Sequence, residues 1–255
     1  MFPCSIVDSS PVGAVTLVLP GQTGTRSKAG IPGPQVVIGR LDDETLLSHP
    51  LGMVEVKICG LTTVDDAVRC IDLGADAIGL NFWGASPRCV DIATAREIVE
   101  AAGDRVTMVG VFVDFTLDQV REILRETGIR WAQLHGDEPP ELVAELLPNA
   151  YKAIGVKDGS AIELARSYPG EHLLLDASVP GMPGGTGRTF DWDIASAVAE
   201  ERKLTLAGGL TPDNVAEAVR VVQPIRVDVA SGVESAPGLK DPGLVRRFIE
   251  AARAT

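Results

Sequence analysis

Three reactive side chains stand at the ends of short apolar runs in this sequence. Cys59 and Asp176 each close such a run, and His135 comes directly after another. Thiol, carboxyl and imidazole groups are among the side chains that donate or accept protons in catalysis. They are therefore candidates for a catalytic site, provided that the fold brings the ends of these runs together.

Two glycine clusters follow further apolar runs. Gly208 and Gly209 lie just before a predicted helix that starts near Thr211, and Ser231 with Gly232 follows the last run. Glycine lets backbone N–H groups approach an anion, and a helix N-terminus adds its dipole. The two clusters predict a phosphorylated substrate. The alternative is that these glycines only form tight turns.

Eight strand–helix units would position these residues. From Val54 onward, short runs rich in β-branched residues alternate with segments whose apolar residues recur every three or four positions. Thr116 and Thr211 each precede a helical segment as N-cap residues. The predicted strands are Glu55–Gly60, Ala77–Asn81, Thr107–Val113, Trp131–Leu134, Tyr151–Ile154, Leu173–Asp176, Leu204–Ala207 and Arg226–Val229.

This alternation predicts an α/β protein that forms a single (β/α)8 TIM barrel. Eight units with short loops in about 200 residues favour a closed barrel, and the active sites of such barrels lie at the C-terminal ends of the strands. An open doubly wound sheet would explain the alternation equally well. No G-x-G-x-x-G motif follows the first strand, so a dinucleotide-binding version has no specific support.

Charge and cysteine usage limit the partners of the chain. Its 255 residues carry a formal net charge of −12, which repels nucleic acid and anionic membranes at long range. No run approaches the roughly 18 apolar residues of a membrane span. The four cysteines form no CxxC pair, and the three histidines show no metal-ligand spacing. We therefore expect a cytoplasmic protein with no metal and with neither nucleic acid nor membrane as partner.

The chain changes character near residue 52. Residues 1–52 hold proline and glycine throughout, without a sustained helical period, whereas residues 53–255 carry the barrel pattern. We expect the first 52 residues to be an N-terminal extension, either a flexible arm or a small β-rich appendage. The alternative is a mis-annotated start, because Met53 begins a run that reads like a natural start.

Several blocks of the sequence resemble phosphoribosylanthranilate isomerases, in the same order. They extend over roughly Val54–Ala252 and read VKICGLTT…SPR, QLHGDE, LLLDA…GGTGRTFDW, LAGGLTPDNV and VDVASGVE…PGLKD. KICG together with GGTGRTFDW is the most specific combination. The resemblance implies an isomerase of tryptophan biosynthesis that needs no cofactor. It would convert the aminoaldose N-(5-phosphoribosyl)anthranilate into the ketose 1-(2-carboxyphenylamino)-1-deoxyribulose 5-phosphate.

The resemblance also implies a role for each site residue. Asp176 would be the general acid that protonates the furanose ring oxygen, and Cys59 the general base that removes the proton from sugar C2. Arg88 would meet the anthranilate carboxylate, as its planar fork suits. His135 and Asp228 would lie near the substrate, although His135 could equally be a structural hydrogen-bonding residue.

Catalysis at neutral pH would require shifted pKa values at the site, and its buried charges must be paired. A free Asp titrates near 3.9 and a free Cys near 8.5, so we expect partial burial to raise the pKa of Asp176 and backbone dipoles to stabilise the Cys59 thiolate. Asp228 lies in an otherwise apolar strand, so its carboxylate must be paired. Lys57 shares the face of Cys59; it either lowers the pKa of that thiol or pairs with carboxylates nearby.

Two other functions stay open at this point. Histidine-pathway phosphosugar isomerases of the same barrel type generally have paired aspartates at strands one and five, whereas here strand one ends in Cys59 and strand six supplies Asp176. A non-catalytic barrel that binds phosphorylated ligands is the second alternative, against which Cys59, Asp176 and Arg88 together argue. Members of the family include monomers and dimers, so we expect either a monomer or a homodimer.

Overall fold

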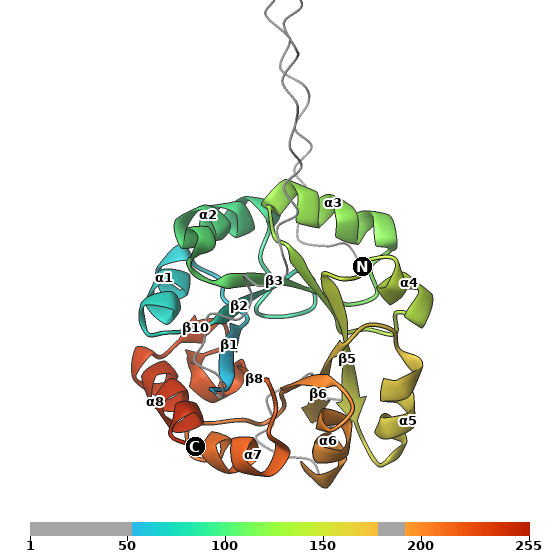
Figure 1. The fold of residues 1–255 in the computed structure, drawn as a ribbon. Helices are drawn as coiled ribbons and strands as arrows, with labels where there is room; N and C mark the ends of the chain where they lie inside the picture. The colour runs from blue at the N-terminus through green and yellow to red at the C-terminus, as the bar shows by residue number, and fades with distance from the viewer. Residues whose placement is uncertain (1–52, 178–191) are drawn as a thin grey trace, which may run out of the picture. The chain divides into compact units, whose positions relative to one another are not determined.

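Residues 53–177 and 192–255 are described by the computed structural model, and within them eight parallel strands pair in chain order. The last strand closes on the first, with Val227 opposite Val56 (Figure 1). The predicted N-terminal extension and most of the GGTGRTFDW block at residues 184–192 lie outside the described residues. The strands are β1 (Glu55–Cys59), β2 (Ala77–Asn81), β3 (Thr107–Phe112), β4 (Trp131–Leu134), β5 (Ala150–Val156), β6 (His172–Ala177), β7 (Lys203–Leu206) and β8 (Arg226–Val229).

The helices form a ring outside the strands (Figure 1). Their apolar faces and the outward faces of the strands bury one large core of aliphatic side chains and phenylalanines. The helices are α1 (Val64–Asp72), α2 (Ile92–Ala102), α3 (Leu117–Thr127), α4 (Pro140–Ala144), α5 (Ser160–Ser167), α6 (Trp192–Ala199), α7 (Val215–Val222) and α8 (Pro242–Arg253). The closed TIM barrel predicted from the alternation is therefore confirmed, and the open sheet is excluded.

Strand boundaries agree with the prediction to within two residues. β2, β4 and β8 have the predicted bounds. The largest difference is in β5, which continues past Ile154 because Gly155 and Val156 pair with the end of β6. A glycine followed by one valine gives no local signal for a strand. The extension depends on pairing with a segment about twenty residues away.

One predicted helix start is confirmed and one is wrong. Thr116 caps α3 in a capping box with Gln119. The helix expected near Thr211 begins instead at Val215. Asn214 has a non-helical φ of −121°, so the regular helix starts only after it. Its side chain closes the preceding turn: Oδ1 accepts from the Thr211 N–H at 2.8 Å, and Nδ2 donates to the Gly209 carbonyl at 3.0 Å. The Thr211 carbonyl accepts from the Val215 N–H at 3.1 Å, which leads this turn into α7.

The N-terminal half of the barrel interior is filled by packed side chains. Tyr151 stacks on His172 with ring centroids 4.4 Å apart, and His172 Nε2 lies 2.7 Å from Thr205 Oγ1. Tyr151 also belongs to a small apolar cluster with Val109, Ala153, Leu174 and Ala207. This floor leaves the other end of the interior for polar groups.

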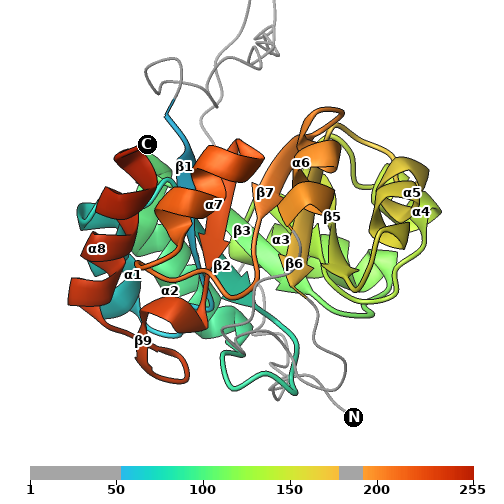
Figure 2. The ribbon, with the colours of Figure 1, turned by 90° about the horizontal axis from the view of Figure 1, so that it is seen from below.

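A short hairpin follows β8 at that other end. After the 3₁₀ turn Ser231–Val233, the strands β9 (Glu234–Ala236) and β10 (Leu239–Lys240) pair antiparallel before α8 begins. In the side view of Figure 2, β9 lies at the lower end of the barrel. No helix within the described part of the chain is long and apolar enough to cross a membrane.

Candidate active site

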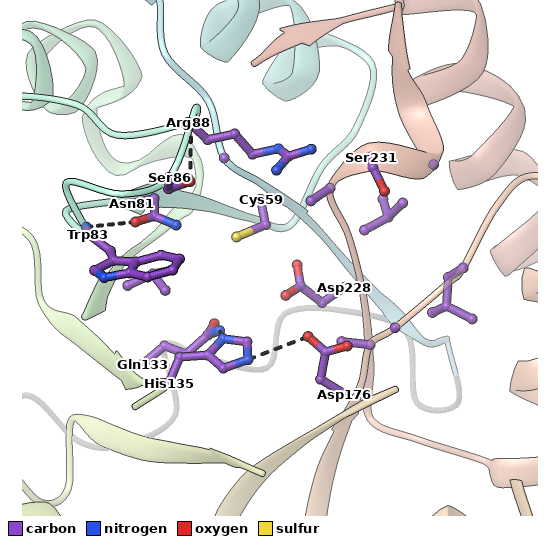
Figure 3. A pocket seen from close by; sticks show the side chains of 18 of the residues that line it. Cys59, Asn81, Trp83, Ser86, Arg88, Gln133, His135, Asp176, Asp228 and Ser231 are labelled. Atoms are coloured by element: carbon purple, nitrogen blue, oxygen red, sulfur yellow. Dashed lines mark hydrogen bonds and ion pairs between the residues drawn. The ribbon is translucent and has the colours of Figure 1, made fainter. Parts of the chain in front are cut away.

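A cavity of about 430 Å³ opens at the C-terminal ends of the strands (Figure 3). This volume lies in the range of small-molecule sites. The residues predicted for the site all line it, namely Cys59, Arg88, His135, Asp176, Gly208, Gly209, Asp228, Ser231 and Gly232. Asn81, Trp83 and Gln133 line it as well. The fold thus brings together residues that are separated by up to 173 positions in the sequence.

Cys59, Lys57 and Asp228 occupy neighbouring positions on β1 and β8. The Lys57 ammonium lies 3.0 Å from Asp228 Oδ2, and the two side chains are 0% and 7% exposed. Gly79 on β2 provides the space, because a Cβ there would lie 2.7 Å from Cys59 Sγ and 3.0 Å from Lys57 Nζ. The expected pairing of Asp228 is confirmed, and so is the shared face of Lys57 and Cys59.

The pKa of the Cys59 thiol is higher than usual, contrary to the expectation of a stabilised thiolate. Removal from water raises this pKa, and the ammonium of Lys57 opposes the shift without offsetting it. For Lys57 itself, burial lowers the pKa, but the charges of Asp228 and Cys59 outweigh burial and raise it. Lys57 is therefore a permanent cation, and it favours the thiolate once Cys59 loses its proton.

Asp176 on β6 and His135, the residue after β4, face each other at the cavity. His135 Nε2 lies 3.5 Å from Asp176 Oδ2 (Figure 3). Gln133 Nε2 lies 3.1 Å from the other ring nitrogen of His135. The second carboxylate oxygen of Asp176, Oδ1, is buried without a hydrogen-bond partner among the described residues, as is Oδ1 of Asp228. Two carboxylate oxygens beside the cavity are thus buried and not satisfied by any described group.

Arg88 is held in place by a residue that the sequence analysis did not single out. Its Nε and Nη2 donate to the two carboxylate oxygens of Glu234 at 2.8 and 2.7 Å. Lys240 donates to the same carboxylate at 2.7 Å and to the Ala230 carbonyl at 3.1 Å. Burial alone would raise the pKa of Glu234, but the bonds from Arg88 and Lys240 outweigh it and lower that pKa. The β9–β10 hairpin therefore positions the guanidinium at the cavity.

The glycine loops after β7 and β8 lie side by side on the cavity wall. Gly208 and Gly209 both have positive φ, at +88° and +65°, a conformation that favours glycine over residues with a Cβ. α7 starts only at Val215, so the loop residues themselves, and not a helix beginning at Thr211, line the cavity. Backbone amides in such turns form concave sites for anions.

Within the described residues, no group of three or more His, Cys, Asp or Glu side chains is arranged to hold a metal ion. The groups at the cavity include a thiol, two carboxyls, an imidazole, a guanidinium and the glycine-rich loops. They can bind anions and transfer protons. Fold and site together define a class, that of (β/α)8-barrel enzymes that move protons on a small anionic substrate.

Comparison with known proteins identifies the family within this class. The model of the N-(5'-phosphoribosyl)anthranilate (PRA) isomerase family matches residues 56–251. The chain belongs to this family.

Relatives and solved structures agree with the family match. The N-(5'-phosphoribosyl)anthranilate isomerase of Pelobacter propionicus is 44% identical over 203 residues, covering 80% of this chain and 97% of that protein. The enzyme of Pseudomonas aeruginosa strain UCBPP-PA14 is 47% identical, covering 79% and 96%. The crystal structure of the Thermotoga maritima enzyme superposes with a TM-score of 0.74 at 38% identity, covering 80% of this chain and all of that chain.

A further structure bears on the ligand. A phosphoribosylanthranilate isomerase solved in complex with reduced 1-(o-carboxyphenylamino)-1-deoxyribulose 5-phosphate has a TM-score of 0.71 and 36% identity, with coverage of 80% and 100%. These matches leave about a fifth of this chain uncovered, and the family match begins only at residue 56. The N-terminal 52 residues therefore lie outside the part that the family shares.

Proposed function

We propose that this protein isomerises N-(5'-phosphoribosyl)anthranilate to 1-(2-carboxyphenylamino)-1-deoxyribulose 5-phosphate, a step of tryptophan biosynthesis. The observation that carries the proposal is that Cys59 and Asp176 reach one cavity from β1 and β6, in a chain that belongs to the isomerase family. A partly exposed thiol and a carboxyl at the same cavity provide a proton acceptor and a proton donor.

The two anionic ends of the substrate have matching groups at the cavity. The bidentate pair of Arg88 with Glu234 uses Nε and Nη2, so Nη1 takes no part in it. The planar guanidinium suits a planar carboxylate such as that of the anthranilate. The loops at Gly208–Gly209 and Ser231–Gly232 present backbone amides for the phosphate. Local binding of this kind is compatible with the net charge of −12, because fixed dipoles act at short range.

The first chemical step opens the ring. Asp176 donates its proton to the furanose oxygen while the bond from this oxygen to C1 breaks. The lone pair of the anthranilate nitrogen then forms the C1=N bond of a protonated Schiff base. Donation in place to the leaving oxygen is worth about 10²- to 10⁴-fold in rate for general acids of this kind.

The second step removes the proton from C2. The Cys59 thiolate accepts this proton, the C–H pair forms a C1=C2 bond, and the C=N electrons return to nitrogen. Loss of the C2 hydroxyl proton and protonation of C1 then give the ketose, and exchange with water restores Asp176 and Cys59. The positive Schiff base makes the C2 proton more acidic, which counteracts the raised pKa of the thiol. Lys57 stabilises the thiolate in the same step.

The proposal is tested with full-length protein and substrate generated in situ, followed by loss of the fluorescence of the aminoaldose. The histidine-pathway aminoaldose is supplied in parallel. We expect turnover of the anthranilate substrate with a kcat/KM well above that for the rival. Preference for the rival would assign the protein to the histidine pathway. Binding of phosphorylated sugars by folded protein without turnover of either compound would leave a ligand-binding barrel.

We further infer that the protein works in the cytoplasm as a monomer or a homodimer. Cys59 and Cys70 are free thiols, and a reducing compartment preserves the thiol that the mechanism needs. The enzyme of Thermotoga maritima has been described as dimeric, and monomers generated from it have been crystallised. Light scattering of the purified protein decides between the two states.

A further inference from the structure

A line of four side chains connects the packed floor of the barrel to the proposed general acid. The Tyr151 hydroxyl donates to Gln133 Oε1 at 3.1 Å, and Gln133 Nε2 lies 3.1 Å from His135 Nδ1. His135 Nε2 in turn lies 3.5 Å from Asp176 Oδ2. Tyr151 and Gln133 are buried. Gln133, His135 and Asp176 line the cavity (Figure 3). The mechanism described above uses only the last member of this line.

The charges around Tyr151 determine the direction of the first hydrogen bond. Burial raises the pKa of Tyr151 to about 12, so its hydroxyl is protonated at neutral pH. Lys57 and Arg226, which act on this phenol from β1 and β8, are donors only. Asp228 also acts on this phenol, but its carboxylate is paired with Lys57. The Tyr151 hydroxyl donates its hydrogen bond to Gln133, which presents its carbonyl oxygen to Tyr151.

The orientation of Gln133 then determines the tautomer of His135. With its oxygen turned to Tyr151, the amide presents its NH₂ group, which can only donate. His135 Nδ1 must accept this bond, so the neutral ring carries its single proton on Nε2. The Nε2–H group faces Asp176 Oδ2. In the other tautomer Nε2 would be an acceptor and would compete with the substrate for the proton of Asp176.

We propose that Gln133 and Tyr151 are positioning residues that fix His135 as the Nε2–H tautomer, so that His135 donates to Oδ2 of Asp176 and orients the carboxyl of the proposed general acid. The inference rests on the proposed function insofar as Asp176 is the general acid. The tautomer itself is a property of the free protein and does not depend on the substrate.

The tautomer is measured directly by ¹⁵N NMR of the histidine side chains in labelled full-length protein. Spectra are recorded above pH about 8, where an ordinary imidazole with a pKa near 6.5 is neutral. The His135 signals are assigned by their loss in His135→Gln. We expect a protonated Nε2 and an unprotonated Nδ1. A protonated Nδ1 in the wild-type protein would overturn the inference, whether or not the protein turns over the substrate.

Two variants test the role of the partners. Gln133→Leu removes the donor to Nδ1, and we expect a detectable Nδ1–H population together with a fall in kcat of about tenfold or more, with KM changed much less. Tyr151→Phe removes one hydroxyl and retains the ring, so it replaces Gln133→Leu if that variant fails to fold. We expect the Nδ1–H population to rise and kcat to fall in this variant too. An unchanged tautomer and kcat in a folded variant would refute the inference. A tautomer that responds in a protein without turnover would instead refute the proposed function alone.

Discussion

His172 makes the barrel sensitive to acid in a way that can be calculated. Burial, and then the charges of Arg226, Lys203 and Lys57, lower the pKa of His172 from 6.5 to about 3. Below pH 6.5 the unfolded chain binds a proton at this residue that the folded barrel does not bind. The contribution of neutral His172 to the free energy of unfolding is therefore complete above pH 6.5 and is lost as the pH falls toward 3. The loss is about 1.4 kcal/mol per pH unit, or roughly 5 kcal/mol over the whole range.

The perturbation that isolates this effect is His172→Gln, which does not titrate and can still bond to Thr205. Urea unfolding at pH about 7.5 and about 5 compares the two proteins above the range where most carboxylates titrate. We expect the wild-type protein to lose roughly 2 kcal/mol more of its free energy of unfolding than the variant does between these conditions. The other histidines contribute equally to the losses of the wild-type protein and of the variant. Equal losses in the two proteins would refute the reasoning.

Three further results follow from the site. Glu234→Gln weakens the anchoring of Arg88, and we expect KM to rise roughly five- to tenfold, as for the loss of about 1 kcal/mol, with kcat nearly unchanged. Lys57→Met removes the cation that lowers the pKa of Cys59, so the rising limb of the pH profile of kcat/KM moves to higher pH; an unmoved limb contradicts the role of Lys57. Deletion of residues 1–52, which lie outside the family match, leaves kcat/KM unchanged, and a large fall would assign these residues to the fold or the site.

The architecture could be predicted from the sequence because each strand–helix unit carries its own signal. Short β-branched runs and capping residues such as Thr116 are local features. The extension of β5 over Gly155 and Val156 depends on pairing with β6, and no local pattern encodes it. Thr211 has the sequence of a helix start, and its carbonyl accepts from the Val215 N–H, but the φ of −121° at Asn214 delays the regular helix to Val215. A propensity argument does not show the dihedral angles of a single residue.

The site residues could be predicted by type, but their surroundings could not. Strand ends and the family resemblance together indicated Cys59 and Asp176. Glu234 lies 146 positions from Arg88, and only the closed barrel and its hairpin bring the two together. Its place two residues after the Ser231–Gly232 cluster was the available signal. The pKa of Cys59 was predicted in the wrong direction, because the sequence does not show how completely the thiol is removed from water.

The most direct test of the account is the kcat/KM for N-(5'-phosphoribosyl)anthranilate of wild-type protein, Cys59→Ser and Asp176→Asn. Cys70→Ser is the matched control, because Cys70 is a buried thiol on α1 that does not line the cavity. We predict turnover by the wild type and the control, and a fall of about 10²- to 10⁴-fold in each of the two site variants, as for loss of a general acid or base. Near wild-type turnover by either folded site variant would contradict the proposed roles of the thiol and the carboxyl.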